Sequence, residues 1–131
     1  MSTVVEVPGG SRIDRVLEQV RRRLPHRPSA ADLPALRTQG ALIVDIRLVE
    51  QRTRDGELAG AVVGDRNVLE WRLDPTSPHH IPEATGTDQL IVLVCNEGYA
   101  SSLAALSLQK LGLARATDLD GGFQGVLALR R

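Results

Sequence analysis

The chain has 131 residues, of which 42% are hydrophobic and 24% charged, and this balance is typical of one globular domain with its own core. Sixteen basic and sixteen acidic side chains cancel, which argues against nucleic acid as a partner because such binding usually needs a basic excess. No apolar run approaches the roughly 18 residues of a transmembrane helix, and residues 1–10 lack the pattern of a signal peptide. We expect a cytoplasmic protein that binds neither nucleic acid nor a membrane.

Side chains suited to metal binding are few. Cys95 is the one cysteine, so an intramolecular disulfide is excluded, and with three histidines a structural zinc site is not expected. The adjacent His79 and His80 lie in residues 74–88, a stretch rich in Pro, Ser and Thr. We interpret it as a surface loop and not a metal site, because neighbouring side chains face different ways on most backbones. No metal and no cofactor is predicted.

The N-terminal part of the chain has the pattern of helices. Apolar residues at helical spacing predict an amphipathic helix over residues 11–24, capped by Ser11. The Arg21–Arg23 run at its end is either an anion-binding patch or a solvated helix end. We favour the solvated end, because basic residues suit the negative pole of the helix dipole. A second, short helix is predicted over residues 29–38.

Apolar runs and helical patterns then alternate along the chain. Strands are predicted at residues 41–46, 61–63, 90–94 and 116–119, and helices at residues 67–73, 101–111 and 123–129. Asn67 is expected to cap its helix. Trp71 and Tyr99 either pack in the core or line the mouth of a site, and for Trp71 we favour the core. The alternation predicts an α/β fold of three layers, with a mostly parallel central sheet flanked by helices. We assign residues 1–131 to a single domain, with an N-terminal helical extension over residues 1–28 and a core over residues 29–131.

The segment that indicates chemistry is Cys95–Ser102, C-N-E-G-Y-A-S-S. It follows the most apolar strand, and ligands bind at the carboxyl ends of parallel strands. Inward-facing loop amides and the positive end of the next helix would both favour a thiolate, or a persulfide, at Cys95. The alternative is an inert, buried cysteine. Ser101 and Ser102 suit either a cap of that helix or the lining of an anion site.

Four motifs in order resemble the rhodanese family of sulfurtransferases over about residues 29–129. They are L-I-V-D-I-R at 42–47, G-E-L-A-G-A at 56–61, C-N-E-G-Y-A-S-S at 95–102 and D-L-D-G-G-F at 118–123. The stretch at 67–75, N-V-L-E-W-R-L-D-P, is similar to single-domain members from high-GC Gram-positive bacteria. The resemblance implies a rhodanese-like fold and an enzyme of the thiosulfate or thiol sulfurtransferase type.

The resemblance also assigns roles to residues. Cys95 would be the catalytic nucleophile, which takes a sulfane sulfur from a small donor such as thiosulfate and passes the sulfur to cyanide, a thiol or a protein acceptor. Asp45 and Arg47 match an Asp-x-Arg motif and would form a supporting charge pair. Ser101, with Ser102 beside it, would donate hydrogen bonds to the sulfur anion. The residues of the implied substrate- and anion-binding loop are Asn96, Glu97, Gly98, Tyr99, Ala100, Ser101 and Ser102.

Two features of the loop depart from that family. Many members have an arginine where Ala100 stands, and Glu97 adds a negative charge, so weak binding of thiosulfate is expected. The alternative function is a catalytically weak rhodanese-like module that binds a partner or senses redox state. Phosphatases with the same fold close a longer loop with an arginine. No arginine occurs between Cys95 and Arg115, so phosphatase chemistry is disfavoured.

Overall fold

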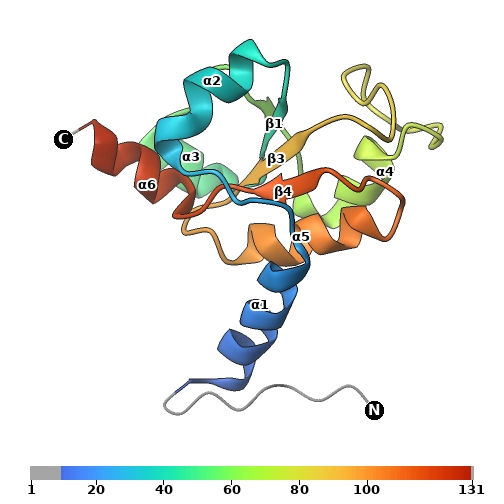
Figure 1. Cartoon of the computed structure of the whole chain (residues 1–131). Helices are drawn as coiled ribbons and strands as arrows, with labels where there is room; N and C mark the ends of the chain where they lie inside the picture. The colour runs from blue at the N-terminus through green and yellow to red at the C-terminus, as the bar shows by residue number, and fades with distance from the viewer. Residues whose placement is uncertain (1–9, 131) are drawn as a thin grey trace.

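The computed structural model describes residues 10–130, in which helices cover both faces of a parallel sheet (Figure 1). Residues 1–9 and 131 lie outside this range, and with them most of the segment on which the absence of a signal peptide was argued. The strands are β1 (Leu42–Asp45), β2 (Val62–Val63), β3 (Ile91–Val94) and β4 (Ala116–Asp118). The α-helices are α1 (Arg12–Arg23), α2 (Leu33–Thr38), α3 (Val49–Asp55), α4 (Leu69–Leu73), α5 (Ala100–Gln109) and α6 (Gly122–Leu129), and the 3-10 helices are η1 (Ala30–Asp32) and η2 (Arg66–Val68).

The sheet has the strand order β2-β1-β3-β4, and each neighbouring pair is parallel. From β1 the chain moves outward to β2, then returns to the other side of β1 with β3. Val44 of β1 lies opposite Leu93 of β3, which lies opposite Asp118 of β4. In open α/β sheets such a reversal opens a crevice at the carboxyl ends of the two central strands. The predicted α/β fold with a parallel sheet is confirmed.

Alternate residues of the central strands enter two apolar layers. Ile91 and Leu93 pack with α4 and α5 on one face of the sheet. Val92 and Val94 pack with η1, α2 and α6 on the other. The continuous apolar runs of β1 and β3 therefore arise because both faces of these strands are buried. Figure 1 shows α1 beside α5, projecting away from the sheet.

Some local predictions were confirmed and others were wrong. Ser11 caps α1 by accepting a hydrogen bond from the Asp14 amide at 3.1 Å. The cap before α4 is Asp65, whose carboxylate accepts from the amide of Asn67 at 2.8 Å. Trp71 is 57% exposed and not a core residue. The short helix α4 turns Leu69 and Leu73 into the core, four residues apart, and Trp71 lies on the other side.

Helix α3 was not predicted, because its sequence V-E-Q-R-T-R-D contains no buried residue and hence no apolar stripe. None of the helices within residues 10–130 has both the length and the apolar character needed to cross a membrane.

Candidate active site

Cys95 directly follows β3 and lies at the switch point between β1 and β3. Its side chain is buried, with 7% of the residue exposed, and it forms part of the wall of a pocket of about 340 Å³. The pocket lies where the strand order reverses, which is the expected ligand position in such a sheet. Its lining residues are Ile46, Arg47, Leu48, Gln51, Arg66, Cys95, Asn96, Glu97, Tyr99 and Ala100.

The loop after Cys95 turns one backbone amide toward the sulfur. The N–H of Gly98 donates to Cys95 Sγ at 3.1 Å. Gly98 has φ +88°, a left-handed conformation that L side chains rarely adopt. A Cβ there would lie 3.0 Å from the amide nitrogen of Gly121, so the loop packs directly on the turn before α6.

The first turn of α6 fixes the other end of the loop. The amides of Phe123 and Gln124 donate to the carbonyls of Cys95 and Asn96, at 2.9 and 3.0 Å. Gly122 permits this approach, because a Cβ on it would lie 2.7 Å from the Cys95 carbonyl oxygen. The donors of the helix terminus thus engage these two carbonyls and hold the first residues of the loop next to the sulfur.

Beneath the sulfur lies a buried carboxylate. Asp118, at the end of β4, accepts hydrogen bonds at one oxygen from the hydroxyls of Ser101 and Ser102, at 2.7 and 2.8 Å. The Cys95 thiol in turn donates to Ser101 Oγ at 3.1 Å. The serines therefore bond to Asp118 in this structure, whereas the sequence led us to expect that they donate to the sulfur. Asp118 was not predicted as a site residue, although it opens the D-L-D-G-G-F motif.

Asp118 is paired with a cation from the N-terminal part of the chain. Arg27 Nε lies 2.7 Å from Asp118 Oδ1, and Arg27 Nη1 lies 3.3 Å from Asp120. Burial disfavours the charged form of Arg27, but the hydrogen bond and charge of Asp118, assisted by Asp120, outweigh it and raise the pKa of Arg27. The negative charge of Asp118 under the loop is therefore balanced by the positive charge of Arg27.

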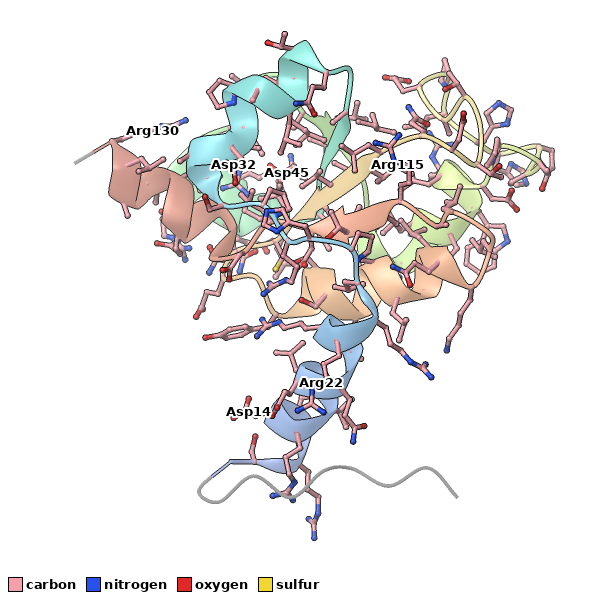
Figure 2. All side chains as sticks on the ribbon, in the orientation of Figure 1. Asp14, Arg22, Asp32, Asp45, Arg115 and Arg130 are labelled. Atoms are coloured by element: carbon pink, nitrogen blue, oxygen red, sulfur yellow. The ribbon has the colours of Figure 1, made fainter. Side chains whose placement is uncertain are left out.

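Asp45 and Arg47 form a buried charge pair, with Arg47 Nη2 2.7 Å from Asp45 Oδ2 and Nε 3.0 Å from Oδ1. Figure 2 shows Asp45 among the central elements. The Arg47 guanidinium also donates to the carbonyl of Gly56 and lies 3.6 Å from the ring centroid of Phe123. The pair thus ties the end of β1 to α6, which itself holds the loop of Cys95.

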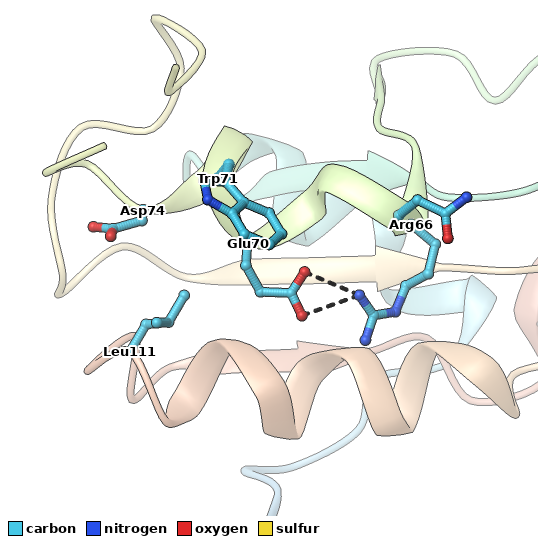
Figure 3. Close-up of a pocket in the computed structure, with 6 residues that line it drawn as sticks. Arg66, Glu70, Trp71, Asp74 and Leu111 are labelled. Carbon is cyan, nitrogen blue, oxygen red and sulfur yellow. Dashed lines mark hydrogen bonds and ion pairs between the residues drawn. The ribbon is translucent and has the colours of Figure 1, made fainter. Parts of the chain in front are cut away.

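Figure 3 shows the lining of a larger hollow of about 640 Å³. Arg66 lines both this hollow and the Cys95 pocket. Arg66 Nη1 donates to both carboxylate oxygens of Glu70, at 3.0 and 3.1 Å. Trp71 and Leu111 form its apolar side. No Cys, Ser, Thr, Lys or His is among its lining residues, and its Glu70 is already paired with Arg66, so the smaller pocket, which contains Cys95, is the candidate active site. No group of three His, Cys, Asp or Glu in residues 10–130 could hold a metal ion.

The interpretation of Arg21–Arg23 as a solvated helix end needs correction at its first residue. Arg22 and Arg23 are exposed, but Arg21 is half-buried. Its guanidinium donates to the carbonyl of Gly98 at 2.8 Å and to Ser102 Oγ at 3.2 Å. Helical spacing places Arg22 opposite the apolar face of α1 and leaves Arg21 and Arg23 on its two flanks. Only the packing of α1 against α5 distinguishes Arg21 from Arg23.

A profile of the family described as Rhodanese-like domain matches residues 29–129. The chain belongs to the rhodanese family. Thiosulfate sulfurtransferase GlpE of Pseudomonas fluorescens (strain SBW25) is 34% identical over 90 residues, which cover 69% of this chain and 73% of that protein.

Two solved structures extend the comparison beyond the sequence. A rhodanese homologue from the extremely thermophilic bacterium Thermus thermophilus matches with a TM-score of 0.54 and 28% identity, and covers 76% of this chain and 99% of its own. A protein of unknown function from Rhodopseudomonas palustris CGA009, described as a possible tyrosine phosphatase, matches with a TM-score of 0.78 and 30% identity. That match covers 98% of this rhodanese-family chain and 97% of the other, so it includes the region of α1 as well.

Proposed function

We propose that this protein is a sulfurtransferase that carries a sulfane sulfur as a persulfide on Cys95. The observation that carries the proposal is the position of Cys95 Sγ in the wall of the switch-point pocket, with the Gly98 amide 3.1 Å away as a donor. An amide aimed at a sulfur stabilises negative charge there, both on a thiolate and on a persulfide. Membership of the rhodanese family and the likeness to a thiosulfate sulfurtransferase support the same activity.

The reaction is two displacements at sulfur. The Cys95 thiolate attacks the sulfane sulfur of the donor, the S–S bond of the donor breaks, and the leaving group departs with the electron pair: sulfite from thiosulfate, or a thiolate from an organic persulfide. Cyanide or a thiolate acceptor then attacks the outer sulfur, and Cys95 leaves as the thiolate. No second cysteine is needed, which agrees with the single cysteine of the chain.

The charges in the pocket favour some donors over others. Glu97 and Ala100 both line it, so the loop presents a carboxylate and no guanidinium of its own to an anionic donor. Arg47 and Arg66 also line the pocket, but each is paired with a carboxylate, of Asp45 and of Glu70. We propose that thiosulfate is a poor donor and that persulfides of low-molecular-weight thiols are better ones, because they carry less charge at the reacting end. A protein acceptor and a cytoplasmic setting stay predictions from the sequence.

Mass spectrometry tests the persulfide. After incubation with thiosulfate, mercaptopyruvate, polysulfide or glutathione persulfide, the protein should gain the mass of one sulfur atom, and cyanide or dithiothreitol should remove it. The variant Cys95→Ser should show no gain. Absence of the adduct with all four donors, in protein whose Cys95 still reacts with iodoacetamide, would overturn the proposal.

That same outcome would support the second candidate, a rhodanese-like module that binds a partner or senses redox state through Cys95. The acidic Glu97 and the missing loop arginine favour this alternative. A phosphatase activity, suggested by the description of the Rhodopseudomonas palustris protein, is less well supported. A phosphate monoester needs a bidentate guanidinium in the loop, and residues 96–114 contain no arginine.

A further inference from the structure

Two arginines from outside the matched domain reach the active loop. The rhodanese-like domain begins at residue 29, whereas Arg21 lies in α1 and Arg27 in the segment that follows it. Arg21 Nη2 donates to the carbonyl oxygen of Gly98 at 2.8 Å, and Arg27 Nη2 donates to the same oxygen at 3.3 Å. A single backbone carbonyl of the loop thus accepts from two guanidinium groups.

Gly98 is also the residue whose amide contacts the sulfur. Its N–H donates to Cys95 Sγ, while its carbonyl is held by the two arginines, so both polar groups of one flexible residue are fixed in opposite directions. Glycine has more backbone freedom than any other residue. The two arginines, together with the Ser102 hydroxyl 3.4 Å from the same carbonyl, restrict the rotation of Gly98 and so help to hold its amide toward the sulfur.

The two arginines differ in the charge that they bring. Arg27 pairs with the carboxylates of Asp118 and Asp120. Within the described part of the chain, the contacts of Arg21 are with neutral groups: the Gly98 carbonyl, the Ser102 hydroxyl and the ring of Tyr99, whose centroid is 5.9 Å from the guanidinium carbon. The positive charge of Arg21 is therefore not cancelled by a carboxylate in these contacts, and it stands beside a loop with no arginine of its own.

We propose that α1 is a working part of the active site, in which Arg21 positions the loop through Gly98 and lends it the positive charge that Ala100 does not supply. Arg21 is a positioning residue: it contacts the loop and not the reacting sulfur. The inference deepens the proposed function and rests on Cys95 as its nucleophile.

The test compares two neighbouring arginines of the same helix in the full chain. Arg21→Gln removes the charge that faces the loop. Arg22→Gln is the matched control, because Arg22, labelled on α1 in Figure 2, pairs with Glu18 at 2.6 Å and has a side chain that is 60% exposed. The readout is the rate of Cys95 alkylation by iodoacetamide across pH, which needs no sulfur donor and therefore stands apart from the test of sulfur transfer.

We expect Arg21→Gln to slow alkylation at neutral pH by about three- to tenfold and to move the midpoint of the pH profile upward, because the loop that holds the thiolate loses the cation bonded to its Gly98 carbonyl. Arg22→Gln should match the unchanged protein. Arg21→Lys keeps the charge and should keep the midpoint. The other charged groups that face the sulfur and its loop are retained in every variant, as is the phenol of Tyr99; the charged groups are Arg27, Arg47, Arg66, Glu97 and Asp118.

Two results would overturn the inference. One is the same alkylation profile for Arg21→Gln and Arg22→Gln in folded protein. The other is an Arg21→Gln protein that is alkylated more slowly but with an unchanged pH midpoint, and whose loss of rate matches its loss of melting temperature. That result would mean that Arg21 only stabilises the fold. If Arg21→Gln does not fold, the Arg21→Lys midpoint decides: a midpoint shifted upward despite the retained charge contradicts the proposed role.

Discussion

The hydroxyl of Ser101 lies 2.7 Å from a carboxylate oxygen of Asp118, closer than its 3.1 Å separation from Cys95 Sγ. A serine hydroxyl has one hydrogen to donate. While that hydrogen is directed at Asp118, the Ser101 oxygen can only accept from the thiol, and this arrangement favours the protonated sulfur. Formation of the thiolate or the persulfide requires the hydroxyl to rotate toward sulfur, which leaves Asp118 with Ser102 and Arg27 as donors.

The variant Asp118→Asn tests this account of the hydroxyl. It removes a buried negative charge behind Ser101 and frees the Ser101 hydrogen for the sulfur, so alkylation of Cys95 at neutral pH should become about three- to tenfold faster. The same change should lower the free energy of unfolding by about 1–3 kcal/mol, because the partly buried Arg27 loses the closer of its two carboxylate partners and keeps only Asp120. Iodoacetamide kinetics and urea denaturation measure the two effects.

The matched control is Asp120→Asn. Asp120 also faces Arg27, at 3.3 Å, but its side chain is 64% exposed and it does not contact Ser101. This variant should leave the alkylation rate unchanged. Slower alkylation in folded Asp118→Asn protein would contradict the assignment of the Ser101 hydrogen.

The fold followed from the sequence where burial leaves a pattern. β1 and β3 are buried on both faces, and their continuous apolar runs gave the parallel sheet and its layers. Helix α3 could not be found in this way, because it buries no side chain, and the exposure of Trp71 depends on which face of α4 meets the sheet. Local capping also has more than one solution: Asp65 and Asn67 are both good caps, and η2 selects Asp65.

Some residues of the candidate site can likewise be predicted from the sequence, and others cannot. The position of Cys95 after a buried strand and before a helix is a local feature, and the sequence indicates it. The residues beneath the loop are joined by tertiary contacts: Arg21 and Arg27 precede Gly98 by 77 and 71 positions, and Asp118 follows Ser101 by 17. Such contacts leave no trace in periodicity or composition. Two signals for Asp118 were available: it is an acid at the end of a predicted strand, and it opens the D-L-D-G-G-F motif.

The contact between Gly122 and the loop predicts a large effect of one methyl group. In Gly122→Ala, the added Cβ would meet the Cys95 carbonyl oxygen and the Gly98 nitrogen at 2.7 Å each, in a residue with φ +57°. We expect a loss of about 2–4 kcal/mol in unfolding free energy from the contact and the left-handed backbone together. Persulfide formation should fall at least about tenfold, because the donor to the sulfur is displaced. Thermal denaturation and mass spectrometry measure both.

The variant Gly112→Ala separates the effect of the steric contact from the effect of the left-handed backbone. Gly112 has a similarly left-handed φ of +89°, but nothing lies within 4 Å of an added Cβ. This variant should cost only the backbone preference, about 1 kcal/mol, and should leave persulfide formation intact. Equal losses in the two variants would show that the approach of Gly122 to the loop is unimportant.

Glu70 predicts a specific sensitivity to acid. Burial raises the pKa of Glu70, but hydrogen bonds from Ser107 and Arg66 and the charge of Arg66 outweigh it and hold the pKa below the 4.5 of an ordinary glutamate. A lowered pKa in the folded protein means that the stabilisation is present above 4.5 and is lost as pH falls through the folded value. Glu70→Gln should therefore be less stable at neutral pH and lose less stability between about pH 5 and pH 3.

Urea denaturation at a series of pH values measures how steeply the free energy of unfolding falls as the pH is lowered. Glu57→Gln is the control, because Glu57 is exposed and lies outside both pockets. It should keep the acid slope of the unchanged protein. A Glu70→Gln slope as steep as that of the unchanged protein would contradict the contribution of Glu70.

The missing loop arginine predicts a gain of activity. Ala100 is exposed, lines the Cys95 pocket and begins α5, so Ala100→Arg has room to point its guanidinium at a bound anion. We expect kcat/KM for thiosulfate to rise by about tenfold, mostly through KM, because the added cation offsets Glu97. Ala100→Gln, of similar length without charge, should show no gain. The gain of Ala100→Arg should shrink at high ionic strength, because salt screens charges at a solvated site. Flat or reduced activity in a folded Ala100→Arg protein would mean that electrostatics in the pocket do not limit the use of thiosulfate.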